Sequence, residues 1–533
     1  MNRDVPPVYT RPRRFDTPAR GSIMSANLMR PLLMISVLTL ALRLILAASG
    51  DEGIKPLRSM GTPGSYRDWA RSHTPEPFGW WLAPASGADG STSVAVVVQA
   101  SLASQLTTEL AAFRTDLESA GHSVYQYEVE GGTAESLRAL LTAAHNVHGI
   151  EGALLVGDLP VAWFQAKNLY GEDAYGVWPT DLYYMDLDGV WLDSLRYDVT
   201  DTLTPGADSI LDTHRGNVAP EIYVGRLTPT GLPQAEALRS YFAKDREYRH
   251  DTLPQFQRAL VFVDDDWVSS AAGWQQDIEQ LYPSTLLIAD PESTRADVYR
   301  RLLDKPWAWV SVYAHSFVDR QYIYRKDGSV DAFDASDYYD GDFPVCIYNF
   351  FDCYFCRYTE DWYGGACAIF APTHGLAAVG STSSGGMENG RTFYEVLGQS
   401  KSLGRAFREW FADRARGGFS HSEVCWYYGM TLLGDPFLVP RHYPAEDTQR
   451  LYLTVSPNPV RGMAWTRFEV GQPGDVRLAV FDVAGRLCAS YLNGYCNSGA
   501  YSVKIELPAL PCGIYLLRLE SLGRQRVVKI VRT

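Results

Sequence analysis

Two kinds of segment alternate along the chain between about residues 90 and 440. Short apolar runs rich in β-branched residues predict strands, and longer runs with apolar residues three and four positions apart predict helices. A repeated β-α-β order favours a parallel sheet covered by helices. The order starts again near residue 231, so we expect an α/β region of two halves, 91–230 and 231–440. The clearest elements of the first half are strands at 93–99, 123–129 and 152–160 and helices at 102–120 and 133–144.

The pattern changes after about residue 447. Short strands with alternating apolar and polar residues follow one another, separated by turns rich in Gly and Pro. This pattern predicts a small β-sandwich of roughly 85 residues, at 450–533. The polar, charged segment 441–449 is the predicted linker.

The N-terminal segment has the pattern of a targeting signal. Met29 and Arg30 precede a long apolar run, and small residues follow it at 47–50. A basic start, an apolar centre and small residues after it are typical of a secretory signal peptide. Arg43 interrupts the run, which argues against a permanent membrane span. We therefore assign 1–49 to a signal peptide with an N-terminal extension, and 50–90 to a polar lead-in segment.

Composition narrows the class of partner. Hydrophobic residues make up 46% of the chain and charged residues 21%, as in a globular protein. The net charge of −14 argues against nucleic acid, which favours basic surfaces. The same excess of carboxylates would suit calcium.

Two predicted strands end at residues that can do chemistry. The apolar run 309–313 leads to His315, and the run 344–351 leads to Cys353. Because sites in open α/β sheets form at the carboxyl ends of strands, these two side chains are expected to face each other. A thiolate is the nucleophilic form of cysteine, and an imidazole can accept its proton and return it to a leaving amine. The alternative is a buried core cysteine and a hydrogen-bonded core histidine.

The cysteine count limits the disulfides that the chain can form. Five of the eight cysteines lie in the central region and three in the C-terminal region, so neither group can pair completely within itself. Cys353 and Cys356 have the spacing of a redox or zinc pair. No second pair with zinc-ligand spacing accompanies them.

An acidic segment suggests a metal site. Asp186, Asp188 and Asp193 surround Gly189 in the run TDLYYMDLDGVWLD. Carboxylates alternating beside a Gly turn can provide oxygen ligands for calcium. The spacing is not that of an EF-hand, because no Glu stands at the twelfth position of the loop. The alternative is a solvated acidic loop.

Several of these segments, in this order, resemble a known family. The central region is similar to the gingipain-type cysteine peptidases, peptidase family C25, which share the caspase-like fold. The resemblance rests on GALLVGDLP, TDLYYMDLDG, EIYVGRL, YAHS, FFDC, GLAAVGSTSSGG and LLGDPFLVP. The C-terminal region resembles the sorting domains of the type IX secretion system and the related FlgD-like Ig module. That resemblance rests on SPNPV, VRLAVFDVAGRLC, GIYLLRLE and KIVRT.

The resemblance implies a role for particular residues. Cys353 matches the family's nucleophile and His315 its histidine, with Cys356 and Cys346 as alternative nucleophiles. The family usually has Gly after the histidine, where this chain has Ser316. The backbone N–H groups of Ser316 and Cys353 would form the oxyanion hole, because a backbone donor does not depend on the side chain.

Other roles implied by the family fall on acidic residues. An acid in the zone 264–266 would support the histidine, and Asp265 is preferred. Asp277 lies in the helix region that corresponds to the family's acidic substrate pocket, so it is a candidate substrate-binding residue. His374 and His421 are further candidates for the base, although their turn and helix-start positions favour structural roles.

Together these features predict a secreted cysteine endopeptidase. Its partners would be protein or peptide substrates and the secretion machinery, with no organic cofactor and with structural calcium. The alternative is an exported binding protein on a peptidase-like scaffold that has lost activity. A thiol–disulfide protein built on Cys353 and Cys356 is a third hypothesis.

Overall fold

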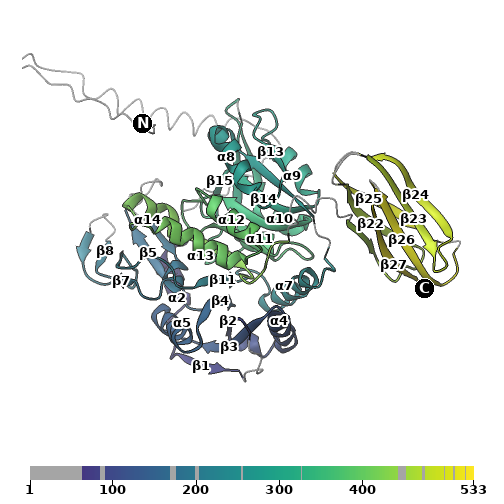
Figure 1. Ribbon diagram of the computed structural model, residues 1–533. Coiled ribbons are helices and arrows are strands. Elements are labelled where there is room, and N and C mark those ends of the chain that lie inside the picture. The colour runs from purple at the N-terminus through teal and green to yellow at the C-terminus, as the bar shows by residue number, and fades with distance from the viewer. Residues whose placement is uncertain are drawn as a thin grey trace, which may run out of the picture. The chain divides into compact units, whose positions relative to one another are not determined.

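The computed structural model places most of the chain after residue 62 (Figure 1). The predicted signal peptide and most of the predicted linker lie outside the described residues. The described segments are 63–83, 90–167, 176–197, 203–253, 256–325, 327–441, 452–470, 474–496, 499–507, 510–521 and 524–533.

One eleven-stranded sheet forms the α/β region, in the order β1-β3-β2-β4-β11-β20-β19-β18-β14-β12-β13. In the first half, β2, β3, β4 and β11 are parallel, and β1 adds an antiparallel edge. The bounds are β1 (Gly79–Leu82), β2 (Thr92–Gln99), β3 (His122–Glu130), β4 (Ile150–Val156) and β11 (Tyr223–Leu227).

The second half is parallel from β13 to β19. The last strand, β20, pairs antiparallel with β19 and parallel with β11, so the two halves run in opposite directions within one sheet. The reversal between the two halves was not predicted. The bounds are β12 (Arg258–Val263), β13 (Ser284–Ile288), β14 (Trp307–Tyr313), β18 (Val345–Phe351), β19 (Ala377–Ser381) and β20 (Met430–Gly434).

Helices cover both faces of the sheet because its central strands are apolar on both sides. In β2, Val94 and Val96 belong to the hydrophobic core on one face, and Ala95 and Val97 to the core on the other. Figure 1 shows α4 and α5 on opposite faces of β2 and β3. The main helices are α4 (Thr107–Ser119), α5 (Ala134–His148), α7 (Gln234–Arg249), α8 (Val268–Ile278), α9 (Ala296–Leu303), α10 (Ala335–Gly341), α11 (Gly364–Ile369), α12 (Arg391–Gly398), α13 (Leu403–Arg414) and α14 (His421–Tyr427).

Short elements fill the connections. The helix predicted at 102–120 is broken into α3 (Ala100–Ala103) and α4. A small antiparallel sheet of β15 (His315–Phe317), β16 (Arg320–Tyr324) and β17 (Val330–Asp334) follows β14. The others are α2 (Tyr66–Ser72), α6 (Leu182–Met185), η1 (Asp265–Trp267), β5 (Trp163–Ala166), β6 (Gly176–Pro179), β7 (Val190–Leu192), β8 (Leu195–Tyr197), β9 (Leu203–Pro205) and β10 (Thr213–Arg215).

The C-terminal region folds into two antiparallel sheets around a core of its own, which confirms the predicted Ig-like β-sandwich. Three strands form one sheet and four form the other. The strands are β21 (Tyr452–Ser456), β22 (Met463–Val470) and β25 (Gly499–Glu506), then β24 (Leu487–Cys496), β23 (Gly474–Asp482), β26 (Gly513–Ser521) and β27 (Arg524–Arg532). Among the described residues, no helix has the length and apolar character needed to cross a bilayer.

Candidate active site

The strands that carry His315 and Cys353 are neighbours in the sheet. Parallel strands β14 and β18 pair with Tyr313 opposite Phe351. His315 and Cys353 each stand two positions beyond that pair, so the chain brings them to the same edge of the sheet at the same height. Adjacent strands lie about 4.8 Å apart. Both residues therefore follow the ends of neighbouring strands, and their roles stay a prediction.

The His315 ring is held by a carboxylate and two aromatic rings. Its Nε2 lies 2.8 Å from Oδ2 of Asp266. The ring centroid is 4.5 Å from that of Trp267 and 4.9 Å from that of Tyr324. The His315 side chain remains 39% exposed, so it can reach a substrate.

The three consecutive aspartates before α8 have carboxylates with different hydrogen-bond partners. Asp264 is buried, and its carboxylate accepts the backbone N–H of Asp266 at 3.1 Å and of Tyr324 at 2.5 Å. Burial raises the pKa of Asp264. Asp265 instead accepts a hydrogen bond from Thr294 Oγ1 at 3.0 Å. The residue that contacts the His315 ring is thus Asp266 rather than the preferred Asp265.

Cys353 sits in a tight turn directly after β18. The residue is half-buried. Burial raises the pKa of its thiol, while hydrogen bonds from the Gly385 amide and the Ser384 side chain act in the opposite direction. Among the described residues, no hydrogen bond joins this thiol to the His315 ring, whose Nε2 contacts Asp266.

Two hydrogen bonds connect the backbone around His315 to the backbone around Cys353. Before the histidine, the Ala314 N–H donates to Oδ1 of the buried Asp352 at 3.2 Å. After it, the Ser316 hydroxyl donates to the carbonyl oxygen of Cys353. The Gln321 amide also donates to Asp352, and burial raises the pKa of Asp352 well above its usual range. These hydrogen bonds hold the ends of β14 and β18 in a fixed position relative to each other.

The predicted oxyanion donors are available. The β15–β16 hairpin pairs Phe317 with Arg320 next to its two-residue loop, and Ser316 with Gln321 one step further along. Because hydrogen-bonded and non-hydrogen-bonded pairs alternate in an antiparallel ladder, Ser316 occupies a non-hydrogen-bonded pair and its N–H points away from β16. Within the described part of the chain, the Cys353 N–H also has no acceptor.

The alternative nucleophiles are buried, and the alternative bases have other partners. Cys346 and Cys356 are fully buried, and burial raises the pKa of Cys346 to about 12 and that of Cys356 well above its usual value. All eight cysteines are free thiols, so Cys353 and Cys356 form no disulfide. His374 contacts Thr373, and His421 contacts the backbone carbonyl of Lys167.

Asp277 lies near the end of α8 and is half-buried. Burial raises its pKa, Arg391 acts to lower it and Glu395 to raise it. Both of these charged neighbours belong to α12. No described contact joins Asp277 to His315 or Cys353, so its role in substrate binding stays a prediction.

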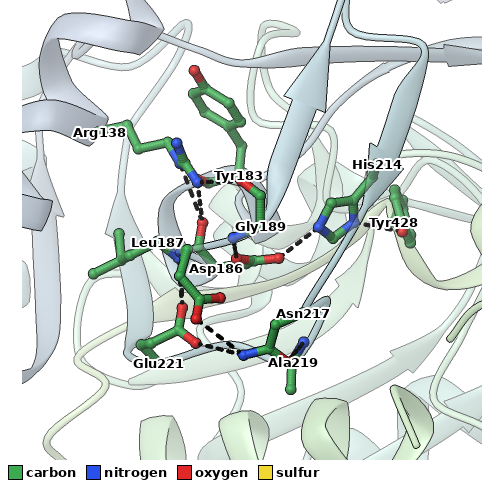
Figure 2. A network of polar contacts seen from close by, with 11 residues as sticks. Arg138, Tyr183, Asp186, Leu187, Gly189, His214, Asn217, Ala219, Glu221 and Tyr428 are labelled. Carbon is green, nitrogen blue, oxygen red and sulfur yellow. Dashed lines mark hydrogen bonds and ion pairs between the residues drawn. The ribbon is translucent and has the colours of Figure 1, made fainter. Parts of the chain in front are cut away.

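A second polar network lies around the predicted metal segment (Figure 2). Ligand oxygens of Asp186, Asp188 and Glu221 all lie within 4.8 Å of one another. Asp186 also contacts His214 Nε2 at 2.5 Å, and the Asn217 amide lies 3.2 Å from Asp188. The third acid of this cluster is Glu221, from the segment before β11, and not the predicted Asp193.

Asp193 has a separate role. Its carboxylate accepts the backbone N–H groups of Asp208, at 3.0 Å, and of Ser209, at 2.7 Å. Asp264, Asp266 and His315 also place one ligand atom each within 4.8 Å of the others. In that group, Asp264 is already occupied by two backbone N–H donors.

Sequence reasoning missed three kinds of contact in these two clusters. Trp267 and Tyr324 flank the histidine, but aromatic residues near a strand end are too common to signal that role. Glu221 is remote in sequence from Asp188, and only the path of the chain brings them together. The Ser316 hydroxyl has a sequence signal, since a side chain stands where the family has Gly, but the sequence does not show which group the hydroxyl contacts.

Comparisons with known proteins agree with the sequence resemblance. The profile of peptidase family C25 matches residues 88–441. The profile described as "Secretion system C-terminal sorting domain" matches residues 454–533. No curated protein matches the chain.

Solved structures that are similar to parts of the chain include the following two. Dimeric latent PorU from Porphyromonas gingivalis is 12% identical over 82% of this chain and 42% of its own, with a TM-score of 0.29. The sulfur carrier protein SoxY from Chlorobium limicola f thiosulfatophilum is 10% identical over 16% of this chain and 73% of its own, with a TM-score of 0.12.

Proposed function

Because the chain belongs to peptidase family C25, we propose that it is an exported cysteine endopeptidase in which Cys353 is the nucleophile and His315 the general base and acid. The observation that carries the proposal is the shared register of β14 and β18, because His315 and Cys353 each follow the paired residues Tyr313 and Phe351 by two positions. The half-buried thiol, the exposed ring and the two free backbone donors support it.

The proposed reaction has two stages. The Cys353 thiol gives its proton to His315, and the sulfur forms a bond to the substrate carbonyl carbon. The N–H groups of Ser316 and Cys353 stabilise the oxyanion, and each such donor contributes roughly 10²–10³ in rate. The C–N bond then breaks, and the leaving amine takes the proton from His315. Water, deprotonated by His315, hydrolyses the thioester and restores the thiol.

Asp266 would act on the ring. Its carboxylate lies 2.8 Å from Nε2 of His315 and would stabilise the imidazolium that forms when the thiol is deprotonated. Acceptance of the thiol proton by Nδ1 leaves this contact intact.

Labelling with a thiol-directed peptide probe, such as a peptidyl chloromethyl ketone, tests the proposal. Wild type should label at Cys353 and cleave a peptide library, and Cys353→Ala and His315→Ala should do neither. Cys356→Ala is the matched control, because that thiol is fully buried and should not contribute. Labelling of Cys353 that persists unchanged in His315→Ala would contradict the dyad.

A second candidate function is an inactive peptidase-like binding protein. One observation favours it: burial raises the pKa of the Cys353 thiol, and the thiol makes no described hydrogen bond to the base. In that case, wild type would bind peptides without cleaving any member of the library.

We also propose that calcium binds at Asp186, Asp188 and Glu221. Three carboxylates with ligand oxygens within 4.8 Å of one another match the oxygen ligands that calcium prefers. In a thermal-unfolding assay, calcium chloride should raise the melting temperature of wild type and EGTA should reverse the effect. The rise should disappear in Glu221→Gln and persist in Asp193→Asn, whose carboxylate holds a separate turn. An equal rise with and without Glu221 would rule out this ligand set.

Export is the part of the function that the C-terminal region supplies. The sorting-domain match covers residues 454–533, which form the β-sandwich. We propose that this domain directs the chain through a type IX secretion system to the cell surface or beyond. Removal of residues 450–533 should leave the peptidase region behind in the cell.

A further inference from the structure

The peptide unit that follows the nucleophile is held at both of its ends. Its carbonyl oxygen, that of Cys353, accepts the hydroxyl of Ser316. Its N–H, that of Tyr354, donates to the carbonyl of Ser383 at 2.8 Å. The orientation of this peptide plane determines the ψ angle of Cys353.

The turn needs that support because its backbone is strained. Tyr354 has φ of 61°, in the left-handed region that residues with a side chain seldom adopt. Such a conformation costs about 1–2 kcal/mol. It persists only where surrounding contacts determine it, and at this turn they include the Ser316 and Ser383 bonds and the Arg357 N–H, which donates to the Tyr354 carbonyl at 3.0 Å.

Ser316 is itself well anchored. It lies in β15 opposite Gln321 of β16, and the Gln321 amide donates to Asp352, the residue before the nucleophile. The Tyr338 hydroxyl donates in turn to the Gln321 side chain at 2.7 Å. The Ser316 hydroxyl therefore extends from a rigid hairpin, and it can impose a position on the Cys353 carbonyl.

We propose that Ser316 is a positioning residue that acts through its hydroxyl on the peptide after Cys353. The bond fixes the position of the Cys353 carbonyl and, together with the strand before it, the orientation of the Cα atom that carries the thiol relative to the His315 ring. The side chain at this position thus has a task that a Gly could not perform, while the Ser316 N–H is left for the oxyanion. This inference rests on the proposed peptidase function.

Substitutions of Ser316 test the role of the hydroxyl. Ser316→Ala and Ser316→Gly should lower kcat by about 10- to 100-fold, since a displacement of about 1 Å at a reacting group costs on the order of 10²-fold. KM should stay within about twofold, because the hydroxyl does not touch the substrate. Ser316→Thr keeps the hydroxyl and should restore kcat to within a few-fold of wild type. Ser329→Ala, in an exposed turn of the same small sheet, should behave as wild type.

A second readout separates positioning from stability. The rate of Cys353 alkylation by iodoacetamide, followed from pH 5 to pH 9, should fall in Ser316→Ala and Ser316→Gly at every pH where wild type reacts, and should recover in Ser316→Thr. The melting temperatures of these variants should stay near that of wild type. A loss of rate that only follows a loss of melting temperature would mean a structural role and would overturn the inference.

The remaining outcomes distinguish this inference from the function on which it rests. If wild type cleaves peptides and Ser316→Ala is equally active, the inference alone fails. If Ser316→Thr is as slow as Ser316→Ala while both stay folded, the hydroxyl is not the active group and the inference again fails. If wild type neither cleaves peptides nor shows alkylation that depends on His315, the peptidase proposal fails and this inference fails with it.

Discussion

At the scale of single residues, one step along a short helical turn decides which carboxylate reaches His315. Asp265 and Asp266 are adjacent in η1, and successive residues of a 3₁₀ turn point about 120° apart. Asp266 therefore faces the ring, while Asp265 faces Thr294. Adjacent carboxylates look equivalent in the sequence but have different partners in the fold.

Exchange of each carboxylate for its amide tests this assignment. Asp266→Asn should lower kcat by about tenfold to a hundredfold, because the imidazolium formed in the reaction loses its charged partner. Asp265→Asn, the matched control, should remain within about twofold of wild type. Steady-state kinetics on a cleaved peptide measure both. A larger loss in Asp265→Asn than in Asp266→Asn would reverse the assignment.

The sequence therefore predicts only some of the residues of the candidate site. His315 and Cys353 follow continuous apolar strands, and the ends of such strands can be located from sequence. The choice among three consecutive aspartates depends on the rotation of a turn, which apolar periodicity does not encode. The Ser316 hydroxyl bond depends on a left-handed residue at Tyr354, and a tyrosine gives no sequence signal for that conformation.

At the scale of secondary-structure elements, a buried lysine fastens the helix that follows the Cys353 loop. Lys244, on α7, donates through Nζ to the carbonyl oxygens of Ile369, Ala371 and His374 at 2.6–2.7 Å. These carbonyls lie at and just after the end of α11, where a helix has no internal donors for them. One side chain thus satisfies the end of α11 and fixes the chain that leads into β19.

Removal of that ammonium group should be costly. Lys244→Met keeps most of the side-chain volume but leaves three carbonyls without this donor, so the free energy of unfolding should fall by about 2–4 kcal/mol. Urea denaturation measures the change. Arg239→Met, on the exposed side of the same helix, should change it by less than about 0.5 kcal/mol. Equal effects of the two substitutions would show that Lys244 does not fasten α11.

Most elements of the sheet could be predicted, but their connections could not. Strands β2, β4, β14 and β18 are buried on both faces, so their apolar runs are easy to locate, although Ser311 interrupts β14 and Asn349 interrupts β18. The reversal between β19 and β20 leaves no trace in periodicity, because parallel and antiparallel buried strands have the same apolar pattern. The contact of Glu221 with Asp188 arises from the return of the chain through β10 toward β11, which no local spacing reveals.

At the scale of the whole α/β region, buried charges hold the two halves of the sheet together. Strands β11 and β20 share a single paired position, Arg226 with Leu433. The fully buried Arg226 guanidinium binds Asp181 at 2.6 Å and lies 4.2 Å from the Tyr358 ring centroid. Thr431 of β20 donates to the same Asp181 at 2.8 Å. Side-chain contacts therefore hold β11 and β20 together where a longer ladder of backbone hydrogen bonds would otherwise be needed.

A second buried group joins α7 to the segment after β20. Arg249 contacts two carboxylates at once, Asp245 at 2.9 Å and Asp435. One cation cannot fully compensate two buried anions. Burial raises the pKa of Asp245 to about 7, Arg249 acts against the rise and Asp435 adds to it. At neutral pH the proton on Asp245 is therefore close to being lost.

This raised pKa predicts how stability depends on pH. The pKa of Asp245 is higher in the folded state than its unfolded value near 4, so its contribution to stability is complete below about pH 4 and is lost as the pH rises through 7. The side chain of Asn in Asp245→Asn stays neutral at every pH, so the variant does not lose stability in this pH range. Relative to wild type, the variant should become more stable as pH rises from 4 to 7, by up to about 1.4 kcal/mol per pH unit.

The control for this last prediction is Glu423, whose pKa is shifted in the opposite direction to that of Asp245. Hydrogen bonds from Ser420 lower the pKa of Glu423 in the α14 capping box, so its contribution is present above its unfolded value and is lost only as the pH falls below that range. The difference between Glu423→Gln and wild type should therefore stay flat from pH 5 to pH 7. Urea denaturation at each pH measures both differences. A flat profile for Asp245→Asn would mean that Arg249 keeps both carboxylates charged, and that the contact between α7 and the segment after β20 does not respond to pH.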